Sequence, residues 1–162
     1  MSEASGQERW SDHMDEVFKL PPMRMGAYTA YTLGHDPKHL CFELARYKFC
    51  ARLLEGQASV VEIGCGDGFG MPLVAQSVGR MLGVDTEPRI IEDNRERLRF
   101  LKNCSFETWD LVGRPLPQRF SAAYLLDVIE HVNPPEEDAF VGNLCASLED
   151  DAVCIIGTPN VE

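Results

Sequence analysis

The segment 62–70, EIGCGDGFG, alternates glycines with other residues and begins with an acid. Because glycine has no Cβ, the backbone of such a loop can turn tightly and approach a bound ligand closely. The carboxylate of Glu62 suits a ligand that carries a cation and not a pyrophosphate. A turn without a ligand is the structural alternative, and the conformational freedom that alternating glycines lose on folding disfavours it. The loop therefore indicates a ligand site.

The residues after these glycines distinguish between kinds of nucleotide-binding loop. A Walker phosphate loop ends in GK[ST], and no such sequence follows. A dinucleotide loop has glycine or alanine at the last position of GxGxxG, where helix and strand pack closely, and Phe69 stands there. A nicotinamide-dependent oxidoreductase is therefore a disfavoured alternative.

A second group of polar residues, Asp127, Glu130 and His131, has the spacing i, i+3 and i+4. On a helix these positions share one face, which would bring two carboxylates and an imidazole together. Such a set could bind a divalent metal ion, accept a proton or contact a substrate, or serve structure alone. The sequence leaves these three uses open.

Short apolar segments alternate with helical segments in the part of the chain that carries these groups. Strands that are apolar on both faces and alternate with helices predict one parallel sheet with helices on both faces. The predicted class is α/β, with a Rossmann-like sheet of about five strands. The predicted strands are 58–63, 81–84, 104–108, 120–126 and 152–156, and the predicted helices are about 36–56, 69–78, 88–102 and 134–148.

Length, charge and composition limit the kind of protein. The 162 residues, 44% of them hydrophobic, fit one domain with its own core. A net charge of −11 argues against a broad nucleic-acid surface or a surface for anionic membranes. The polar N-terminus resembles no signal peptide and no apolar run is long enough for a membrane helix, so we expect a cytoplasmic protein. The six scattered cysteines lack zinc-site spacing and are expected to be reduced thiols, mostly in the core.

Residues 1–35 form a predicted N-terminal arm with little regular structure, broken at Pro21 and Pro22. Aromatic and methionine side chains are interleaved with polar residues along it, and they could form a lid over the ligand site or pack into the core. The first clear helix is predicted to start at Asp36 and Pro37, since aspartate is a common N-cap and proline fits the first turn. The ligand-binding domain is therefore placed at 36–162.

The segment VVEIGCGDGFG resembles motif I of the class I methyltransferases that use S-adenosylmethionine (SAM), and later segments keep that family's order over about residues 40–160. Asp85 matches the acid after the second strand, which binds both ribose hydroxyls in the family. Trp109 and Asp110 match the segment beside adenine. LLDVIEHV resembles the stretch that lines the methionine part of SAM. IIGTPN resembles the fifth strand and its exit loop in the ubiquinone-biosynthesis O-methyltransferase branch.

The resemblance implies SAM as the cofactor, with a divalent metal as a disfavoured addition, and methyl transfer to an oxygen or nitrogen of a small molecule. Asp85 would accept two hydroxyl hydrogen bonds, Glu62 would stabilise the methionine ammonium group through water, and Cys65 would contribute its backbone. A non-catalytic SAM-binding module or partner subunit is the alternative. The implied cofactor-binding residues are Glu62, Gly64, Cys65, Gly66, Asp85, Thr86, Trp109, Asp110, Leu111 and Leu126.

The family's sheet has seven strands in the order 3-2-1-4-5-7-6, and strands 6 and 7 are expected to be absent from this chain. The fifth strand, at 152–156, would then be a bare apolar edge, which folded proteins normally avoid. We hypothesise that the chain is the amino-terminal part of a longer enzyme, or that this edge pairs with another copy of the chain.

Overall fold

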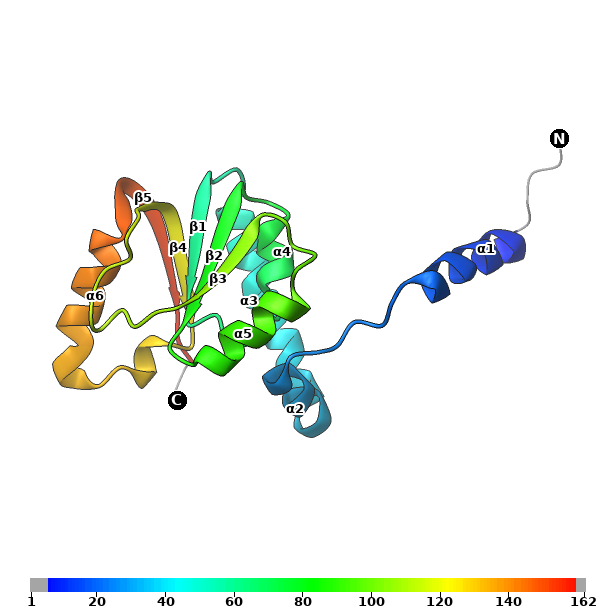
Figure 1. Ribbon diagram of the computed structural model, residues 1–162, viewed down its shortest axis with the longest axis horizontal. Coiled ribbons are helices and arrows are strands. Elements are labelled where there is room, and N and C mark those ends of the chain that lie inside the picture. Colours follow the sequence, from blue (N-terminus) through cyan, green and yellow to red (C-terminus); the bar gives the residue numbers. More distant parts are fainter. Residues whose placement is uncertain (1–5, 160–162) are drawn as a thin grey trace.

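The centre of the molecule is a parallel sheet with the strand order β3-β2-β1-β4-β5 (Figure 1). The computed structural model describes residues 6–159. Each pair of neighbouring strands runs parallel, which confirms the predicted α/β class. The strands are β1 (Ser59–Ile63), β2 (Arg80–Asp85), β3 (Cys104–Thr108), β4 (Phe120–Leu126) and β5 (Leu148–Gly157).

Helices connect these strands in the predicted order, but several are shorter than predicted. The glycine loop delays the helix after β1, which begins only at Met71. The helix after β2 ends at Arg97, because the chain turns at Leu98–Leu101 before β3. The described helices are α1 (Gly6–Lys19), α2 (Ala27–His35), α3 (Pro37–Leu53), α4 (Met71–Ala75), α5 (Pro88–Arg97) and α6 (Glu137–Ala146), with the 3-10 turns η1 (Ile129–His131) and η2 (Pro134–Glu136).

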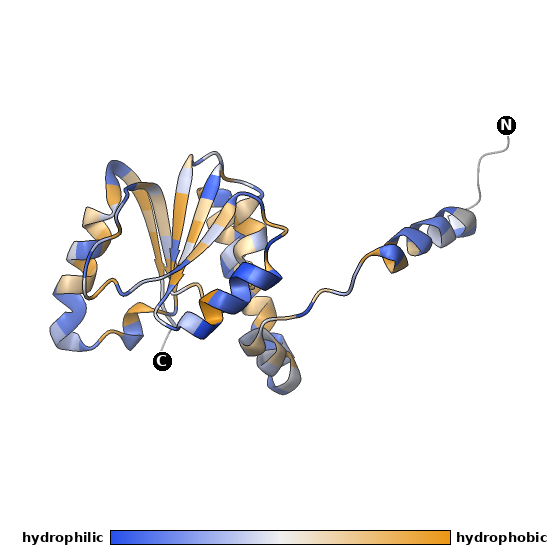
Figure 2. Cartoon of the chain, in the orientation of Figure 1, coloured by the Kyte–Doolittle hydropathy of each residue, from blue (hydrophilic) through white to orange (hydrophobic). Residues whose placement is uncertain are grey.

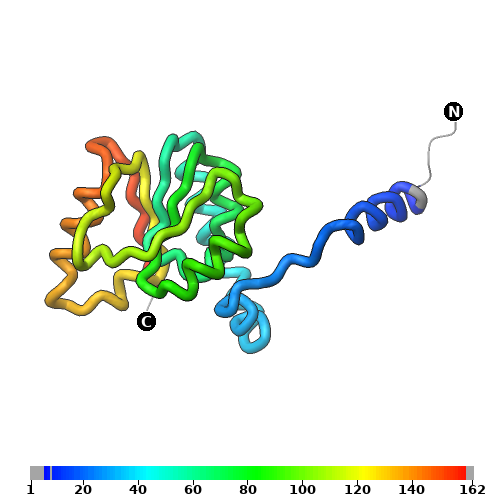
Figure 3. Tube along the Cα trace, viewed as in Figure 1, coloured from blue at the N-terminus to red at the C-terminus, as the bar shows by residue number. Residues whose placement is uncertain are grey.

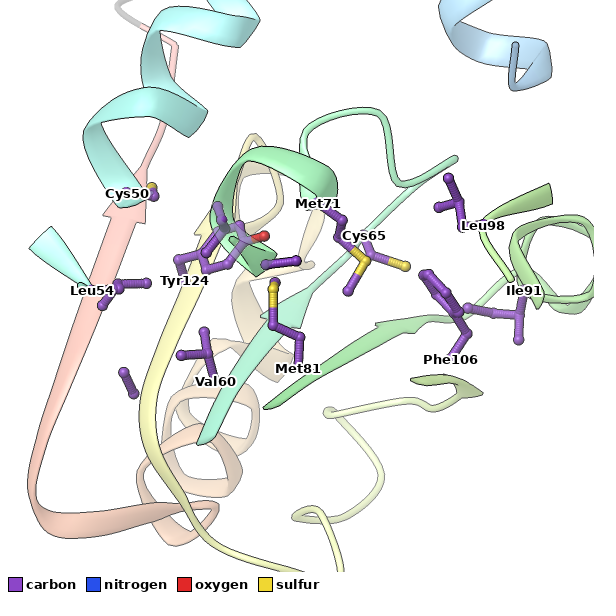
Figure 4. Packing of buried hydrophobic residues seen from close by; sticks show 13 residues of the cluster. Cys50, Leu54, Val60, Cys65, Met71, Met81, Ile91, Leu98, Phe106 and Tyr124 are labelled. Atoms are coloured by element: carbon purple, nitrogen blue, oxygen red, sulfur yellow. The ribbon is translucent and has the colours of Figure 1, made fainter. Parts of the chain in front are cut away.

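The core lies on both faces of the sheet, and every residue of β1 is buried. On one face α3, α4 and α5 pack Leu54, Met71 and Ile91 with strand residues that include Tyr124 (Figure 4). On the other face α6 packs Phe140 against the strands. Figure 2 shows apolar residues gathered in the strands and polar residues on the outer surface of α5. Burial on both faces explains why the strands read as apolar runs.

The N-terminal arm differs from its prediction. It contains two helices, α1 and α2, joined by an extended segment at 20–26, and Figure 3 shows α1 apart from the sheet. The prolines at 21 and 22 interrupt the helical structure, but α1 forms before them and α2 forms after them. The predicted alternative that the arm packs into the core is wrong for its large apolar side chains, since Trp10 is 62% exposed and Phe18 is 82% exposed. Residues 1–5 lie outside the described residues.

β5 lies at one edge of the sheet, as predicted. It begins earlier than predicted because its pairing with β4 is irregular: Phe120 pairs with Leu148, but Ala122 pairs with Val153. Val153 and Ile156 are 38% and 50% exposed, so the edge is apolar among the described residues. Asn160, in the segment IIGTPN, lies outside them.

Two further expectations concern the surface. Cys50 and Cys65 are buried as predicted, but the prediction of core thiols is wrong for the exposed Cys41, Cys145 and Cys154, which lie on outward faces of α3, α6 and the edge strand. All six cysteines are unbonded thiols.

Within residues 6–159, no helix has the length and apolar character that crossing a membrane requires.

Candidate functional site

The glycine loop runs from β1 to α4 at the carboxyl edge of the sheet. Gly64, Gly66 and Gly68 have φ values of 66°, 50° and 65°, in the left-handed region that favours glycine. A Cβ on Gly64 would lie 2.5 Å from a methyl group of Val128, whereas a Cβ on Gly66 would meet no atom within 4 Å. Gly66 therefore faces open space, and the loop forms a cradle.

Two side chains from neighbouring elements hold this loop. Asp85, at the end of β2, accepts a hydrogen bond from Gly66 N at 3.0 Å and another from Glu87 N at 3.0 Å. Asn94, fully buried on α5, donates to Gly66 O at 2.7 Å. Each Asp85 oxygen keeps a lone pair for a further donor, so Asp85 can fix the loop and also accept hydrogen bonds from a ligand.

A first cavity of about 310 Å³ opens where β1, β2 and β3 end. Trp109 is fixed beside it: Trp109 N donates to Asp85 O at 2.9 Å, and its indole Nε1 donates to Arg114 O at 3.1 Å. Asp110 accepts from Val112 N at 2.9 Å, which closes a turn next to the cavity. The predicted residues that line this cavity are Gly64, Asp85, Thr86, Trp109, Asp110 and Leu111.

A second cavity of about 290 Å³ lies on the other side of the glycine loop, where α2 and α3 cover it. Gly64, Asp127 and His131 line both cavities, so the two meet at the ends of β1 and β4. The predicted residues at the second cavity are Gly64, Cys65, Gly66 and Leu126. Nine of the ten predicted cofactor-binding residues therefore line one cavity or the other.

Glu62 is the tenth, and it lines neither cavity. It is buried in β1, where its Oε1 accepts from the Tyr47 hydroxyl at 3.0 Å and its Oε2 accepts from the Tyr124 hydroxyl at 2.7 Å. Burial raises the pKa of Glu62 to about 8, although both tyrosine hydrogen bonds lower it. Since Tyr47 also lines the second cavity, Glu62 lies one hydroxyl group away from it.

The Asp127, Glu130 and His131 group does not form the predicted helical face. Asp127 has φ 55°, and only a short 3-10 turn follows it before the chain reaches the prolines at 134 and 135. Glu130 lines neither cavity. Among the residues that the structure describes, no group of three histidine, cysteine or acidic side chains is placed to hold a metal ion.

Arg46 on α3 binds the Asp127 carboxylate with both terminal nitrogens. Nη1 donates to Oδ1 at 2.6 Å and Nη2 donates to Oδ2. This hydrogen bonding raises the pKa of Arg46. The ion pair holds Asp127 in a backbone conformation that is unusual for a residue with a side chain, at the junction of the two cavities.

Sequence reasoning missed three residues that α3 brings to the second cavity, Glu43, Arg46 and Tyr47. Tyr28 of α2, which also lines it, is one of the arm's aromatic residues for which a lid was a predicted alternative. Glu43 Oε1 lies 3.4 Å from His39 Nε2, and burial raises the pKa of Glu43. A signal was present in the sequence, because Glu43 stands three residues before Arg46 and four before Tyr47, and these spacings put the three side chains near one another on the predicted helix 36–56.

A parallel sheet with a glycine cradle after β1, an acid at the end of β2 and cavities at its carboxyl edge defines a Rossmann-like nucleotide-binding fold, the class to which the class I methyltransferases belong. A family model described as "Methyltransferase domain" matches residues 60–151. This is more than half of the chain, and the chain belongs to that methyltransferase-domain family. None of the curated protein sequences matches it significantly.

Solved structures show the same fold. The DhpI–SAM–HEP complex is similar with a TM-score of 0.64 and 17% identity over 84% of this chain and 65% of that chain. The methyltransferase domain of bacterial CtHen1 is similar with a TM-score of 0.55 and 25% identity, over 60% of this chain and 57% of that chain. The [4+2]-cyclase SpnF is similar with a TM-score of 0.58 and 20% identity, over 65% of this chain and 41% of that chain. The chain thus spans less than two thirds of each of these structures, and one of them is named for another reaction.

Proposed function

We propose that this chain binds SAM across the two cavities and transfers its methyl group to an oxygen or nitrogen of a small molecule. The observation that carries the proposal is the junction of the cavities at Gly64, Asp127 and His131. A ligand with a nucleoside half and an amino-acid half needs two connected compartments, one on each side of the glycine cradle. The similarity to a structure solved with SAM, DhpI, supports this assignment.

The first cavity suits the adenosine half. Asp85 offers two carboxylate oxygens to the ribose hydroxyls, and such charge-assisted hydrogen bonds contribute about 1.5–3 kcal/mol each. Trp109 offers an aromatic surface and Asp110 an acceptor for the exocyclic amine of adenine. Thr86 and Leu111 complete this compartment.

The second cavity suits the methionine half. Arg46 is the one lysine or arginine among the residues that line the two cavities, so it is the natural partner for the methionine carboxylate. The backbone of Cys65 and Gly66 and the side chain of Leu126 border the same space. Glu62 would act on the methionine ammonium group through the Tyr47 hydroxyl or through water.

The charge of the lining residues fits a cationic cofactor. Six carboxylates line the two cavities, against the single guanidinium of Arg46: Glu43, Asp67, Asp85, Asp110, Asp127 and Glu136. SAM carries a sulfonium and a net positive charge, whereas its demethylated product S-adenosylhomocysteine (SAH) carries no charge on sulfur. A negative site favours the cofactor over the product and disfavours anionic acceptors such as carboxylates and phosphates.

When bound, SAM supplies an activated methyl group, so the chain needs mainly to align the acceptor with it. Positioning of this kind can lower a barrier by about 7–11 kcal/mol. His131 lines both cavities and is the candidate to take the proton that an amine or hydroxyl acceptor loses. The resemblance to the ubiquinone O-methyltransferase branch remains a prediction.

The test is a transfer assay with methyl-labelled SAM and a panel of small amines, alcohols and phenols. We expect SAH to form together with a labelled product, and an anionic analogue of the same acceptor to react more slowly. SAM binding without transfer to any acceptor would instead favour the non-catalytic SAM-binding module.

A further inference from the structure

The glycine loop also holds the helix that borders the second cavity. Asp67, between two glycines of the loop, accepts a hydrogen bond from Thr29 N at 2.7 Å and another from Thr29 Oγ1 at 2.9 Å. Both residues are buried, with 7% of Asp67 and 2% of Thr29 exposed. These two bonds join segments that lie 38 residues apart in the chain.

Asp67 acts as the N-cap that α2 itself lacks. The helix follows Gly26, which has no side chain to accept a hydrogen bond from the first turn. Asp67 supplies the carboxylate from the glycine loop, and it binds the third helical residue, which is the usual target of an N-cap side chain. Gly26 is needed for this approach, because a Cβ there would lie 2.2 Å from Asp67 Oδ2.

The same short loop segment is anchored on its other side by α5 and by the end of β2. Arg97 on α5 donates to the backbone oxygen of Asp67, and Asp85 accepts from Gly66 N. A ligand in the cradle that fixes Gly66 therefore also fixes Asp67. On the helix, Tyr28 precedes Thr29 and lines the second cavity.

Apart from the loop, α2 is held by packing against α3 and by the ion pair of Arg24, just before the helix, with Asp93 on α5. It is nine residues long, Tyr28, Tyr31 and Leu33 are exposed, and its buried residues are Thr29 and Thr32. A helix this short is not stable in water without external contacts. The first turn of α2 is therefore set by the loop, while the body of the helix also rests on α3.

We propose that Asp67 is a positioning residue that makes the cover of the second cavity depend on cofactor binding. This inference rests on the proposed function. Cofactor bound in the glycine cradle fixes Asp67, Asp67 fixes the first turn of α2, and α2 places Tyr28 over the space for the acceptor. Binding is then ordered, with SAM before the acceptor.

Hydrogen–deuterium exchange of residues 27–35 tests the coupling without a known acceptor. With SAH as the probe, we expect amide exchange in α2 of the wild-type protein to slow at least about threefold. The Gly26→Ala variant should lose this response even at an SAH concentration that saturates it, because its Cβ displaces Asp67. The Gly34→Ala variant is the matched control on the same helix, since a Cβ there meets no atom within 4 Å.

A milder variant guards against a folding defect in Gly26→Ala. Thr29→Val removes only the hydroxyl bond to Asp67 and should show an intermediate response to SAH. Unchanged exchange of α2 in wild-type protein that binds SAH would overturn the inference, as would a full response in Gly26→Ala. Absence of SAH binding to the wild-type protein would instead overturn the proposed function, and a calorimetric titration distinguishes the two failures.

Discussion

The two cavities on either side of the glycine loop are built by different means. The first is formed by the ends of adjacent parallel strands and by the backbone between Asp85 and Trp109, together with side chains of the 3-10 turns and α6 that follow β4. The second is closed by side chains from α2 and α3 and depends on two contacts between distant segments, Arg46 with Asp127 and Thr29 with Asp67. A sheet edge is rigid because every strand is paired, whereas a short helix keeps its place only through such contacts. We therefore expect the first cavity to supply most of the affinity for SAM. We expect the second cavity to be the one whose cover, α2, changes its mobility when SAM binds.

The largest expected effect is at the first cavity. Asp85→Ala removes the acceptor for both ribose hydroxyls and one anchor of the glycine loop, so the affinity for SAM should fall roughly a hundredfold. Adenosine, which should use the first cavity alone, should lose a similar factor. Calorimetric titration measures both ligands, and the exposed Asp150→Ala serves as the control. An unchanged dissociation constant for SAM would remove Asp85 from the site.

The next effect concerns Glu62, which lies beneath the second cavity. The pKa of Glu62 is about 8 in the folded protein, above the value of 4.5 in an unfolded chain. The folded state therefore binds the proton more tightly, and this contribution to stability is complete below pH 4.5. It is lost as the pH rises to about 8. Glu62→Gln stays neutral at every pH. Its free energy of unfolding relative to wild type should therefore rise by about 2 kcal/mol between pH 6 and pH 8.

Urea denaturation at the two pH values measures this difference. The exposed Glu55→Gln, which also replaces one carboxylate by an amide, is the control at the surface. Parallel profiles for Glu62→Gln and the wild type would contradict the assignment of the buried proton to Glu62.

A smaller effect separates the two cavities directly. Arg46→Gln removes the guanidinium of the second cavity, so SAM affinity should fall about tenfold while adenosine affinity stays the same. Arg52→Gln, on the same helix but exposed, should leave both affinities at the wild-type value. Equal losses for SAM and adenosine in Arg46→Gln would show that the cavities are not independent compartments.

The smallest expected effect is that of metal ions. Because Arg46 occupies both Asp127 oxygens and Glu130 lines neither cavity, magnesium and EDTA should each shift the midpoint of thermal unfolding by less than about 1 °C. A clear stabilisation by magnesium that disappears in Asp127→Asn would restore the metal-binding hypothesis for this group.

The same contrast explains what the sequence could predict. The strands and the first cavity were predictable because their signals are local: apolar runs, alternating glycines, and Asp85 at the end of a strand. Of the second cavity, the glycine loop and Leu126 were predicted, but the wall from α3 was not, because Arg46 and Asp127 are 81 residues apart in the chain and their contact exists only after folding. The helical face proposed for Asp127, Glu130 and His131 failed for a local reason, the left-handed backbone at Asp127. The helices of the arm were missed because two prolines suggested irregular structure throughout.

The central claim is that two connected compartments bind one ligand, SAM. A calorimetric titration of the wild-type chain with SAM and, separately, with NAD tests it most directly. We expect SAM to bind with one site per chain and NAD not to bind, because Phe69 occupies the position where a dinucleotide loop needs a small residue. Binding of NAD without binding of SAM would contradict the account.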